Sequence, residues 1–360
     1  MIYAILLAIL LVALVLLLAW QLLRWLPAGA DRLKPLPYVI ALLPIAPFCA
    51  ALGLVASAVA AVATRSQNEF YKSYLFLCVA YALLFVISLK SYTPYLAVRL
   101  WRIKQEKSPE SSLELSLEKS REIRVMTLNC RYGRANASQI IKLAKTHKID
   151  TILLQEVSKK LVKNLEKLGI KHDFAHVQLG SANGHENGGF NAIYTRLSNV
   201  KSFGKSIKID AANVPIVTAV TCDSSAENLL ITFASAHPKS PMRGCAAWSN
   251  GIMALAKIGE NHNENNVKDV KKVTIIGGDL NSTPDHPSFR ALLKSGFLDA
   301  SMQIGKRLKT WPTWQKWPNL ALDHVLVKST GCNAIATEQR AIRVDGSDHF
   351  ALIVCVSIPL

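Results

Sequence analysis

The stretch GGDLNSTPDHPSF, residues 277–289, places two Asp, one Asn and one His directly after the apolar run VTII. Other apolar runs also stop or start at polar side chains of the kinds that bind ligands and transfer protons. Together these residues are Asn129, Glu156, His237, Asp279, Asn281, Asp323, Asp348 and His349. Ligand sites of open α/β sheets collect at strand ends. Each residue alone has a structural explanation, such as a turn cap, but their joint placement predicts one shared site.

The elements that carry these residues alternate between strand and helix patterns. EIRVMTLNC, ASQIIKLAKTHK and DTILLQEV form a βαβ pattern in which Asn136 or Ser138 caps the helix. An amphipathic helix follows, capped by Ser158 and ended by Gly169. Further strand patterns cover 190–196, 214–222, 229–236, 273–278, 322–327, 332–342 and 350–358, and a helix covers 244–259. These elements predict an α/β domain, a two-sheet β-sandwich flanked by helices.

Three apolar stretches precede this domain. Residues 2–20 carry no charge and are long enough to cross a bilayer as a helix. In residues 37–63, Pro44 and Pro47 predict a kink and not a break, and residues 74–89 extend through SYTPYL. No Lys or Arg precedes the first stretch and no small-residue cleavage site follows it, which argues against a signal peptide. We predict three transmembrane helices, at about 2–22, 38–63 and 74–95.

These patterns divide the chain into a transmembrane region (1–96), a charged, Ser-rich juxtamembrane linker (97–120) and the α/β domain (121–360). The first loop and the segment after the third span carry eight Lys and Arg, against two in the second loop. The three apolar stretches predict a multi-pass protein of the cell membrane. Because positive residues concentrate in cytoplasmic loops, we predict that its N-terminus lies outside and its α/β domain lies in the cytoplasm.

Positive charge is in excess throughout the chain. The formal net charge is +17, and residues 119–360 carry +13 of it. Such a domain attracts phosphate, whether in anionic lipid headgroups or in nucleic acid; solubility alone is the alternative. The seven Cys show neither disulfide nor zinc spacing, so we interpret most of them as small core residues in a reducing compartment. The two His of HDFAH lack a third metal ligand.

The order of seven motifs carries a family resemblance. TLNCR, LLQEV, GGFNAIYTR, SAHP, GGDLNSTPD, LDHVLV and GSDHFAL follow one another as in the endonuclease/exonuclease/phosphatase superfamily, which this sequence resembles from about Arg124 to its end. The resemblance implies a fold like that of pancreatic deoxyribonuclease, which makes residues 121–360 a catalytic domain. It also implies hydrolysis of a phosphoester assisted by Mg²⁺, with Mn²⁺ as the alternative.

The resemblance assigns five residues to the hydrolytic steps. It implies that Asp279 orients or deprotonates the attacking water and that Asn281 donates its amide to a phosphoryl oxygen. His349 is the residue that contacts the scissile phosphate or the leaving oxygen, and Asp323 holds its tautomer and orientation. His237 corresponds to the second histidine of the family.

Other matched residues are implied to bind the metal and the phosphate. Mg²⁺ prefers hard oxygen ligands and needs only one or two protein carboxylates. Glu156 is the main ligand by resemblance, with Asn129 beside it and Asp348 on the opposite wall. Arg131 stands where some members place a phosphate-binding Arg, whose planar fork can bind two oxygens; an ordinary surface Arg is the alternative. Glu186 is a candidate for the carboxylate that supports the second histidine.

Three functions are compatible with these patterns. The first is a membrane-anchored phosphoester hydrolase acting on a lipid or membrane-associated substrate, because a membrane anchor raises the effective substrate concentration. A nuclease is the second, favoured by the positive charge and by Trp311, Trp314 and Trp317, whose rings can stack on bases. The third is a non-catalytic membrane interaction module. The expected partners are the lipid bilayer and a phosphate-containing substrate, lipid-linked rather than nucleic acid; the sequence indicates no protein partner.

Overall fold

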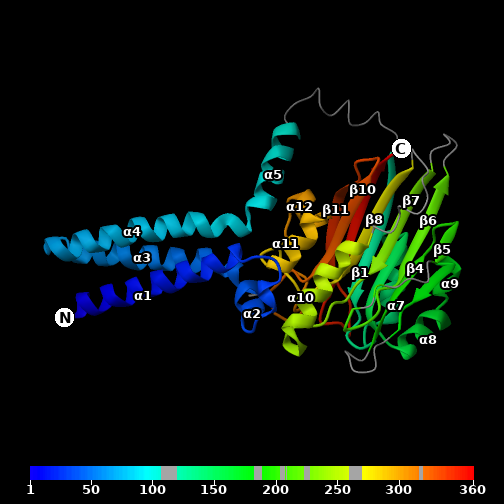
Figure 1. Cartoon of the computed structure of the whole chain (residues 1–360), viewed down its shortest axis with the longest axis horizontal. Coiled ribbons are helices and arrows are strands. Elements are labelled where there is room, and N and C mark those ends of the chain that lie inside the picture. The colour runs from blue at the N-terminus through cyan, green and yellow to red at the C-terminus, as the bar shows by residue number, and fades with distance from the viewer. Residues whose placement is uncertain are drawn as a thin grey trace. The chain divides into compact units, whose positions relative to one another are not determined.

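The computed structural model describes residues 1–106, 120–181, 189–202, 207, 209–222, 228–258, 270–315 and 319–360. Figure 1 gives the labels of its helices and strands. The chain divides into two compact units. The first comprises Met1–Pro94 with Pro284–Pro287, and the second comprises Tyr95–Thr283 with Ser288–Leu360.

The first unit is helical. Its α-helices are α1 Ile2–Leu22, α2 Leu36–Ala41, α3 Ala46–Ala63 and α4 Asn68–Ser88. By length and composition, three segments are able to cross a membrane: Ile2–Trp25, Leu36–Ala63 and Asn68–Ser91. The last starts before the predicted residue 74, and the chain then enters a separate helix, α5 Thr93–Glu106. A 3₁₀ turn over residues 43–45 interrupts the second segment where a kink was expected, since proline lacks the N–H of a regular helix.

Small residues allow α3 to pack closely within this unit. Those buried along one side of the helix are Ala46, Ala50, Gly53, Ser57 and Ala60. A Cβ on Gly53 would lie 2.2 Å from the ring of Tyr81, so only glycine fits there. The Tyr81 hydroxyl donates to the Leu10 carbonyl oxygen at 2.8 Å. Close approach of backbones and hydrogen bonds between helices are the usual stabilising contacts of membrane helices.

The first unit also contains a buried polar network. The Ser91 hydroxyl lies 3.0 Å from both carboxylate oxygens of Asp285 and accepts a hydrogen bond from Arg24 Nη2 at 2.8 Å. Arg24 Nε lies 3.6 Å from Asp285 Oδ1. His286 Nε2 lies 2.9 Å from the carbonyl oxygen of Pro37. In the sequence, Asp285 and His286 simply follow the apolar run VTII, and no pattern predicts these contacts.

The second unit contains two six-stranded sheets. The strand orders are β11-β12-β1-β2-β4-β3 and β5-β6-β7-β8-β10-β9. The bounds are β1 Ser120–Asn129, β2 Thr151–Val157, β3 His176–Leu179, β4 Phe190–Thr195, β5 Val200–Ser202, β6 Ile216–Cys222, β7 Asn228–Ser235, β8 Lys271–Asp279, β9 Leu298–Asp299, β10 Asp323–Thr330, β11 Ile335–Arg343 and β12 Phe350–Pro359. The further helices are α7 Ala137–Thr146, α8 Lys159–Lys167, α9 Ile170–Asp173, α10 Cys245–Ala254, α11 Pro287–Lys294 and α12 Ala300–Ile304.

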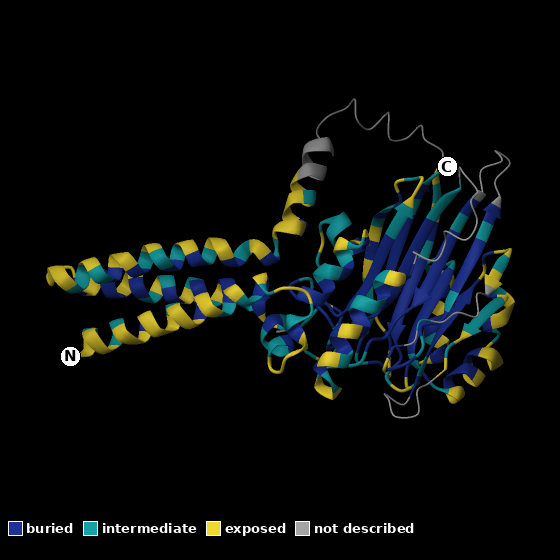
Figure 2. Cartoon of the chain, viewed as in Figure 1, coloured by how far each residue is buried: buried dark blue, intermediate teal, exposed yellow. Residues whose placement is uncertain are grey.

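Alternation along the strands separates the hydrophobic cores of this unit. Val125 and Ile275 lie in the core between the sheets. The next residues, Met126 and Ile276, point to the outer faces, where α7 and α8 cover the first sheet and α10 and α11 cover the second. Figure 2 shows buried strands, with the exposed residues gathered on helices and loops. Burial of such side chains contributes about 1.5–3 kcal/mol each. The predicted two-sheet α/β fold flanked by helices is confirmed.

Local signals fix the ends of two outer helices. Asn136 Oδ1 accepts from the backbone N–H groups of Ser138 and Gln139, at 3.0 and 3.2 Å, so Asn136 is the cap of α7. Ser158 Oγ accepts from the N–H of Leu161 at 3.2 Å and caps α8. These caps follow the predicted chemistry and set where each helix starts after its strand.

Candidate active site

Strand register brings the predicted residues to one edge of the two sheets. β1 and β2 run parallel and pair Asn129 with Gln155, which puts Asn129 next to Glu156. β8 and β10 run antiparallel and pair Asp279 directly with Asp323. A hydrogen bond from Asn129 Nδ2 to Asp279 Oδ2, 3.0 Å long, then joins the two sheets.

Asp279 lies at the centre of this cluster. Its Oδ2 accepts from Asn129 and lies 3.5 Å from His349 Nε2 and 3.6 Å from His237 Nε2. Its Oδ1 accepts from the backbone N–H of Asn281 at 2.9 Å. The side chain is 3% exposed, so little water competes for these contacts. A carboxylate oriented by an amide and two imidazoles is suited to orienting and deprotonating a water molecule.

His349 and Asp323 form a buried imidazole–carboxylate pair. His349 Nδ1 lies 2.8 Å from Asp323 Oδ2, so Nε2 is left to face Asp279. Burial lowers the pKa of His349, but the carboxylates of Asp323 and Asp279 outweigh it and raise the pKa to about 10. His349 is therefore an imidazolium at neutral pH, able to donate a proton to an oxygen. This arrangement has the orientation that the sequence resemblance implies.

Glu156 lies at the site and has a left-handed backbone conformation. Its φ is +50°, and Gly189 packs directly against its backbone. Glu156 Oε2 accepts from the N–H of Tyr132 at 2.9 Å, and Oε1 lies 3.8 Å from His237 Nε2. Glu156 thus reaches the same cluster as Asp279, through a histidine that both contact.

Arg131 and Asp348 lie at the border of the cluster. Arg131 Nε is 3.8 Å from Asp348 Oδ2, and the two side chains are 41% and 21% exposed. The N–H of Arg131 donates to Asn129 Oδ1 at 2.9 Å. An accessible guanidinium two residues from Asn129 is available to a phosphate, although its ion pair with Asp348 also fits a structural role.

The donor set determines how a divalent ion would fit. Among the described residues, Asp279, Asp323 and His349 have ligand atoms within 4.8 Å of one another. His349 is already held by both carboxylates, and a protonated imidazole is not a ligand. Glu156 and Asn129 offer the oxygen ligands that Mg²⁺ prefers. Glu156, Asn129 and Asp348 therefore stay the predicted metal ligands, and the acid–base role of the trio stays a prediction.

Several side chains around the site were not predicted from the sequence. The Tyr132 hydroxyl accepts from Arg243 Nη2 at 2.9 Å. Behind the catalytic strand end, His324 and Asp299 form a second buried pair with Nδ1 and Oδ2 2.6 Å apart. The orientation of His324 could have been predicted, because successive residues of a strand point to opposite faces and His324 follows Asp323 in β10.

Aromatic residues lie close to the pair of His349 and Asp323. The ring centroid of Trp311 is 6.4 Å from that of His349, and Trp314 contacts Trp311 edge-on at 6.2 Å. Trp314 is 62% exposed. The predictions made for Trp317 and Glu186 fall outside the described residues.

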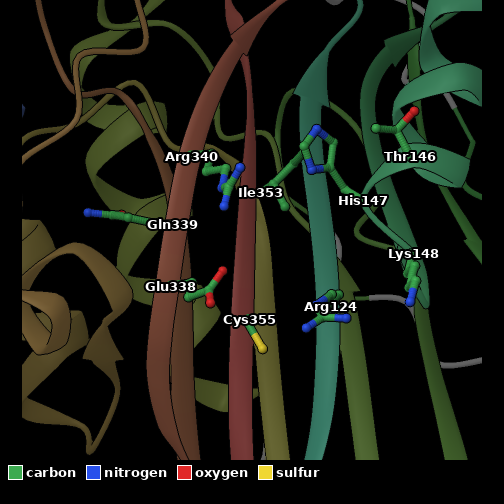
Figure 3. Close-up of a pocket in the computed structure, with 9 residues that line it drawn as sticks. All are labelled: Arg124, Thr146, His147, Lys148, Glu338, Gln339, Arg340, Ile353 and Cys355. Carbon is green, nitrogen blue, oxygen red and sulfur yellow. The ribbon is translucent and has the colours of Figure 1, made fainter.

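A separate pocket lies on the outer face of the first sheet (Figure 3). Its lining residues are Arg124, Thr146, His147, Lys148, Glu338, Gln339, Arg340, Ile353 and Cys355. None of the predicted catalytic or metal-binding residues belongs to this pocket, so it is distinct from the site at the strand ends.

Comparison with known proteins defines the class of this chain. The model of the Endonuclease/Exonuclease/phosphatase family matches residues 126–349. The chain belongs to this family and is a hydrolase that acts on phosphoester bonds. Enzymes of the family generally use divalent metal ions. A search of curated proteins gives no match.

Solved structures are similar to part of this chain. A Bacteroides thetaiotaomicron endonuclease/exonuclease/phosphatase family protein is 16% identical, with a TM-score of 0.50 over 68% of this chain and 97% of its own. D. rerio TDP2, solved with a single-strand DNA product, is 18% identical, with a TM-score of 0.49 over 65% and 98%. A mannosyl-6-phosphatase of Bacteroides thetaiotaomicron is 16% identical, with a TM-score of 0.47 over 65% and 99%.

Proposed function

We propose that this protein is a membrane-anchored, divalent-metal-dependent hydrolase that cleaves a phosphodiester, phosphomonoester or pyrophosphate of a lipid or membrane-associated substrate. The main support is the 3.0 Å hydrogen bond from Asn129 Nδ2 to Asp279 Oδ2. It brings a predicted metal ligand and the predicted water-orienting carboxylate together from different sheets. Three helices long and apolar enough to cross a membrane support the anchoring.

In the proposed reaction, the chain's own residues orient water and neutralise charge. Asp279 Oδ2 holds the attacking water and accepts its proton. His349, protonated and oriented by Asp323, donates from Nε2 to the phosphoryl or leaving oxygen. Asn281 Nδ2, which donates one hydrogen to the Pro238 carbonyl oxygen at 3.3 Å, offers its second hydrogen to the oxygen where negative charge develops.

The metal and phosphate contacts complete the proposal. A divalent cation held by Glu156, Asn129 and Asp348 supplies Lewis-acid polarisation of the phosphoryl oxygen when bound. Arg131 binds a phosphate oxygen with its exposed guanidinium. The domain carrying these residues lies on the cytoplasmic side; in intact expressing cells, external protease should cleave it only after permeabilisation.

The experiment is a substrate panel run on the full chain in detergent or nanodiscs. The substrates are dispersed phosphatidic acid, bis(p-nitrophenyl) phosphate and supercoiled plasmid DNA, each with MgCl₂, MnCl₂ or EDTA. We expect metal-dependent release of phosphate from the lipid and loss of about 10²–10⁴-fold of this activity in Asp279→Asn. Asp173→Asn is the matched control, because it makes the same chemical change at a surface carboxylate that pairs with Lys145.

A nuclease is the second candidate, and the exposed Trp314 beside Trp311 favours it, because stacked rings bind bases. Plasmid nicking that Asp279→Asn abolishes, without turnover of the lipid, would replace the lipid proposal with the nuclease. If Glu156→Ala left every activity of the panel unchanged, the proposed role of Glu156 as the main metal ligand would be wrong.

A further inference from the structure

Asn281 stands in a segment that is fixed at nearly every residue. Its φ is +49°, a left-handed conformation that is uncommon for residues other than glycine, although Asn adopts it more often than most. Before it, the N–H of Leu280 donates to the Leu322 carbonyl oxygen at 2.9 Å, and the Leu280 carbonyl oxygen accepts from Trp248 Nε1 at 3.2 Å. After it, the carbonyl oxygen of Ser282 lies 3.0 Å from His324 Nε2. These contacts hold the conformation that aims the Asn281 amide.

His324 is itself held on its other ring nitrogen. Its Nδ1 lies 2.6 Å from Asp299 Oδ2, and its ring packs against Phe289 with centroids 4.6 Å apart. Because a carbonyl oxygen only accepts, Nε2 must carry the hydrogen that reaches Ser282. Asp299 is fixed in turn, since its Oδ1 accepts from the N–H groups of Ser301 and Met302 at 2.7 and 3.2 Å and caps α12.

Successive residues of β10 therefore serve two different imidazole–carboxylate pairs. Asp323 faces the catalytic centre and orients His349 at 2.8 Å. His324 points to the opposite face of the sheet and reaches Ser282, in the turn that carries Asn281. His324 and Asp299 are 3% and 2% exposed, so neither can contact a substrate.

We propose that the Asp299–His324 pair is a positioning device that holds the Ser282 carbonyl and thereby keeps the Asn281 amide aimed at the phosphoryl oxygen. This inference rests on the proposed function, in which Asn281 donates to the developing charge. Such a donor stabilises the transition state more than the bound substrate. Loss of its alignment therefore lowers kcat and leaves KM nearly unchanged.

The alternative is a buried histidine that only stabilises the core. The test compares His324→Leu, Asn281→Ala and the double variant in the full chain, with bis(p-nitrophenyl) phosphate as substrate. Asn136→Ala is the stability control, because it removes the cap of α7 and should lower the melting temperature without touching the turn. Asp299→Asn is the conservative variant, since its amide still caps α12 and can donate to His324 Nδ1.

We expect His324→Leu to lower kcat about 10- to 100-fold with KM within about twofold. In the double variant, kcat should fall no further than in Asn281→Ala alone, because His324 acts through Asn281. Asp299→Asn should keep more than half of kcat, and Asn136→Ala should keep all of it.

Unchanged kcat in His324→Leu would overturn the inference, and so would fully multiplicative effects in the double variant. If His324→Leu does not fold, His324→Phe replaces it, because its ring can still pack against Phe289 but offers no donor to the Ser282 carbonyl. Failure of the proposed function looks different: the wild-type chain would not turn over the substrate, or Asn281→Ala would retain full kcat.

Discussion

Gly189 lies against the backbone of Glu156, and replacing it with alanine should damage the predicted metal site. A Cβ at Gly189 would lie 2.7 Å from both Cα and C of Glu156 and 3.1 Å from its carbonyl oxygen. Cβ atoms essentially never approach closer than 3.0 Å, and ordinary contact begins at 3.4 Å. Because all three neighbours are backbone atoms, no side chain can rotate away, and Glu156 must move by about 0.7 Å, the difference between 3.4 and 2.7 Å.

The size of this shift sets the expected loss. Catalytic groups must be held within about 0.5 Å of their productive position, and a misplacement of 1 Å can cost about 10²-fold in rate. We therefore expect Gly189→Ala to lower kcat/KM about 10- to 100-fold. It should also raise the Mg²⁺ concentration needed for half-maximal activity, because the displaced carboxylate is the main predicted ligand. Overpacking should destabilise the domain by about 1–3 kcal/mol.

The assay is hydrolysis of bis(p-nitrophenyl) phosphate by the full chain, with Mg²⁺ titrated from zero. Gly251→Ala is the matched control, because its Cβ would meet Pro238 at 3.4 Å, an ordinary contact, within α10. Alanine favours a helix over glycine by about 1 kcal/mol, so this control should retain wild-type activity and at least wild-type stability. Wild-type kcat/KM and Mg²⁺ dependence in Gly189→Ala would refute the assigned role of Glu156.

Three further predictions concern charge. The pKa of His349 is raised to about 10, so its protonated form stabilises the fold. This stabilisation is fully present below the unfolded pKa of about 6.5 and is lost as pH rises through 10. The melting temperature should fall over that window, and it should fall less in His349→Gln. Arg24→Leu leaves the buried Asp285 carboxylate without its guanidinium and should lower the free energy of unfolding by about 3–5 kcal/mol. Adding Asp285→Leu should restore part of the melting temperature, and a double variant without this recovery would contradict the prediction. Arg131→Lys keeps the charge but not the planar fork, so KM should rise about tenfold; an unchanged KM would leave Arg131 a surface residue.

The fold and the membership of the site could be predicted because both follow local rules. Short apolar runs identified the strands, and parallel β1 and β2 required Asn129 and Glu156 to emerge at the same edge. Caps at Asn136 and Ser158 were readable from residue type and position. The convergence of Glu156 and Asp279 on His237 agrees with the strand-end argument, while their catalytic roles remain predictions.

The supporting contacts could not be predicted, because they join residues that have no shared pattern in the sequence. Asp299 lies in β9, a strand of two residues, too short to show periodicity. Its partner His324 lies in the apolar strand β10. Which face of the sheet His324 points to can be recognised only after Asp323 has been placed on the opposite face, at the site. Asp285 belongs to the first unit although the sequence around it continues the catalytic motif. Such pairings depend on tertiary packing and not on local propensity.

Backbone strain is concentrated at the site. Of the described non-glycine residues with left-handed φ, four belong to it: Arg131, Tyr132, Glu156 and Asn281. Three of these turns direct a backbone N–H to a functional side chain: Arg131 to Asn129, Tyr132 to Glu156 and Asn281 to Asp279.

Two of these hydrogen bonds reach a carboxylate, that of Glu156 or Asp279, and the third reaches the neutral amide oxygen of Asn129. The turns thus fix two carboxylates and an amide before substrate arrives. A substitution that lets a turn relax would release these side chains while keeping every catalytic residue type, so the left-handed turns are part of the preorganised site.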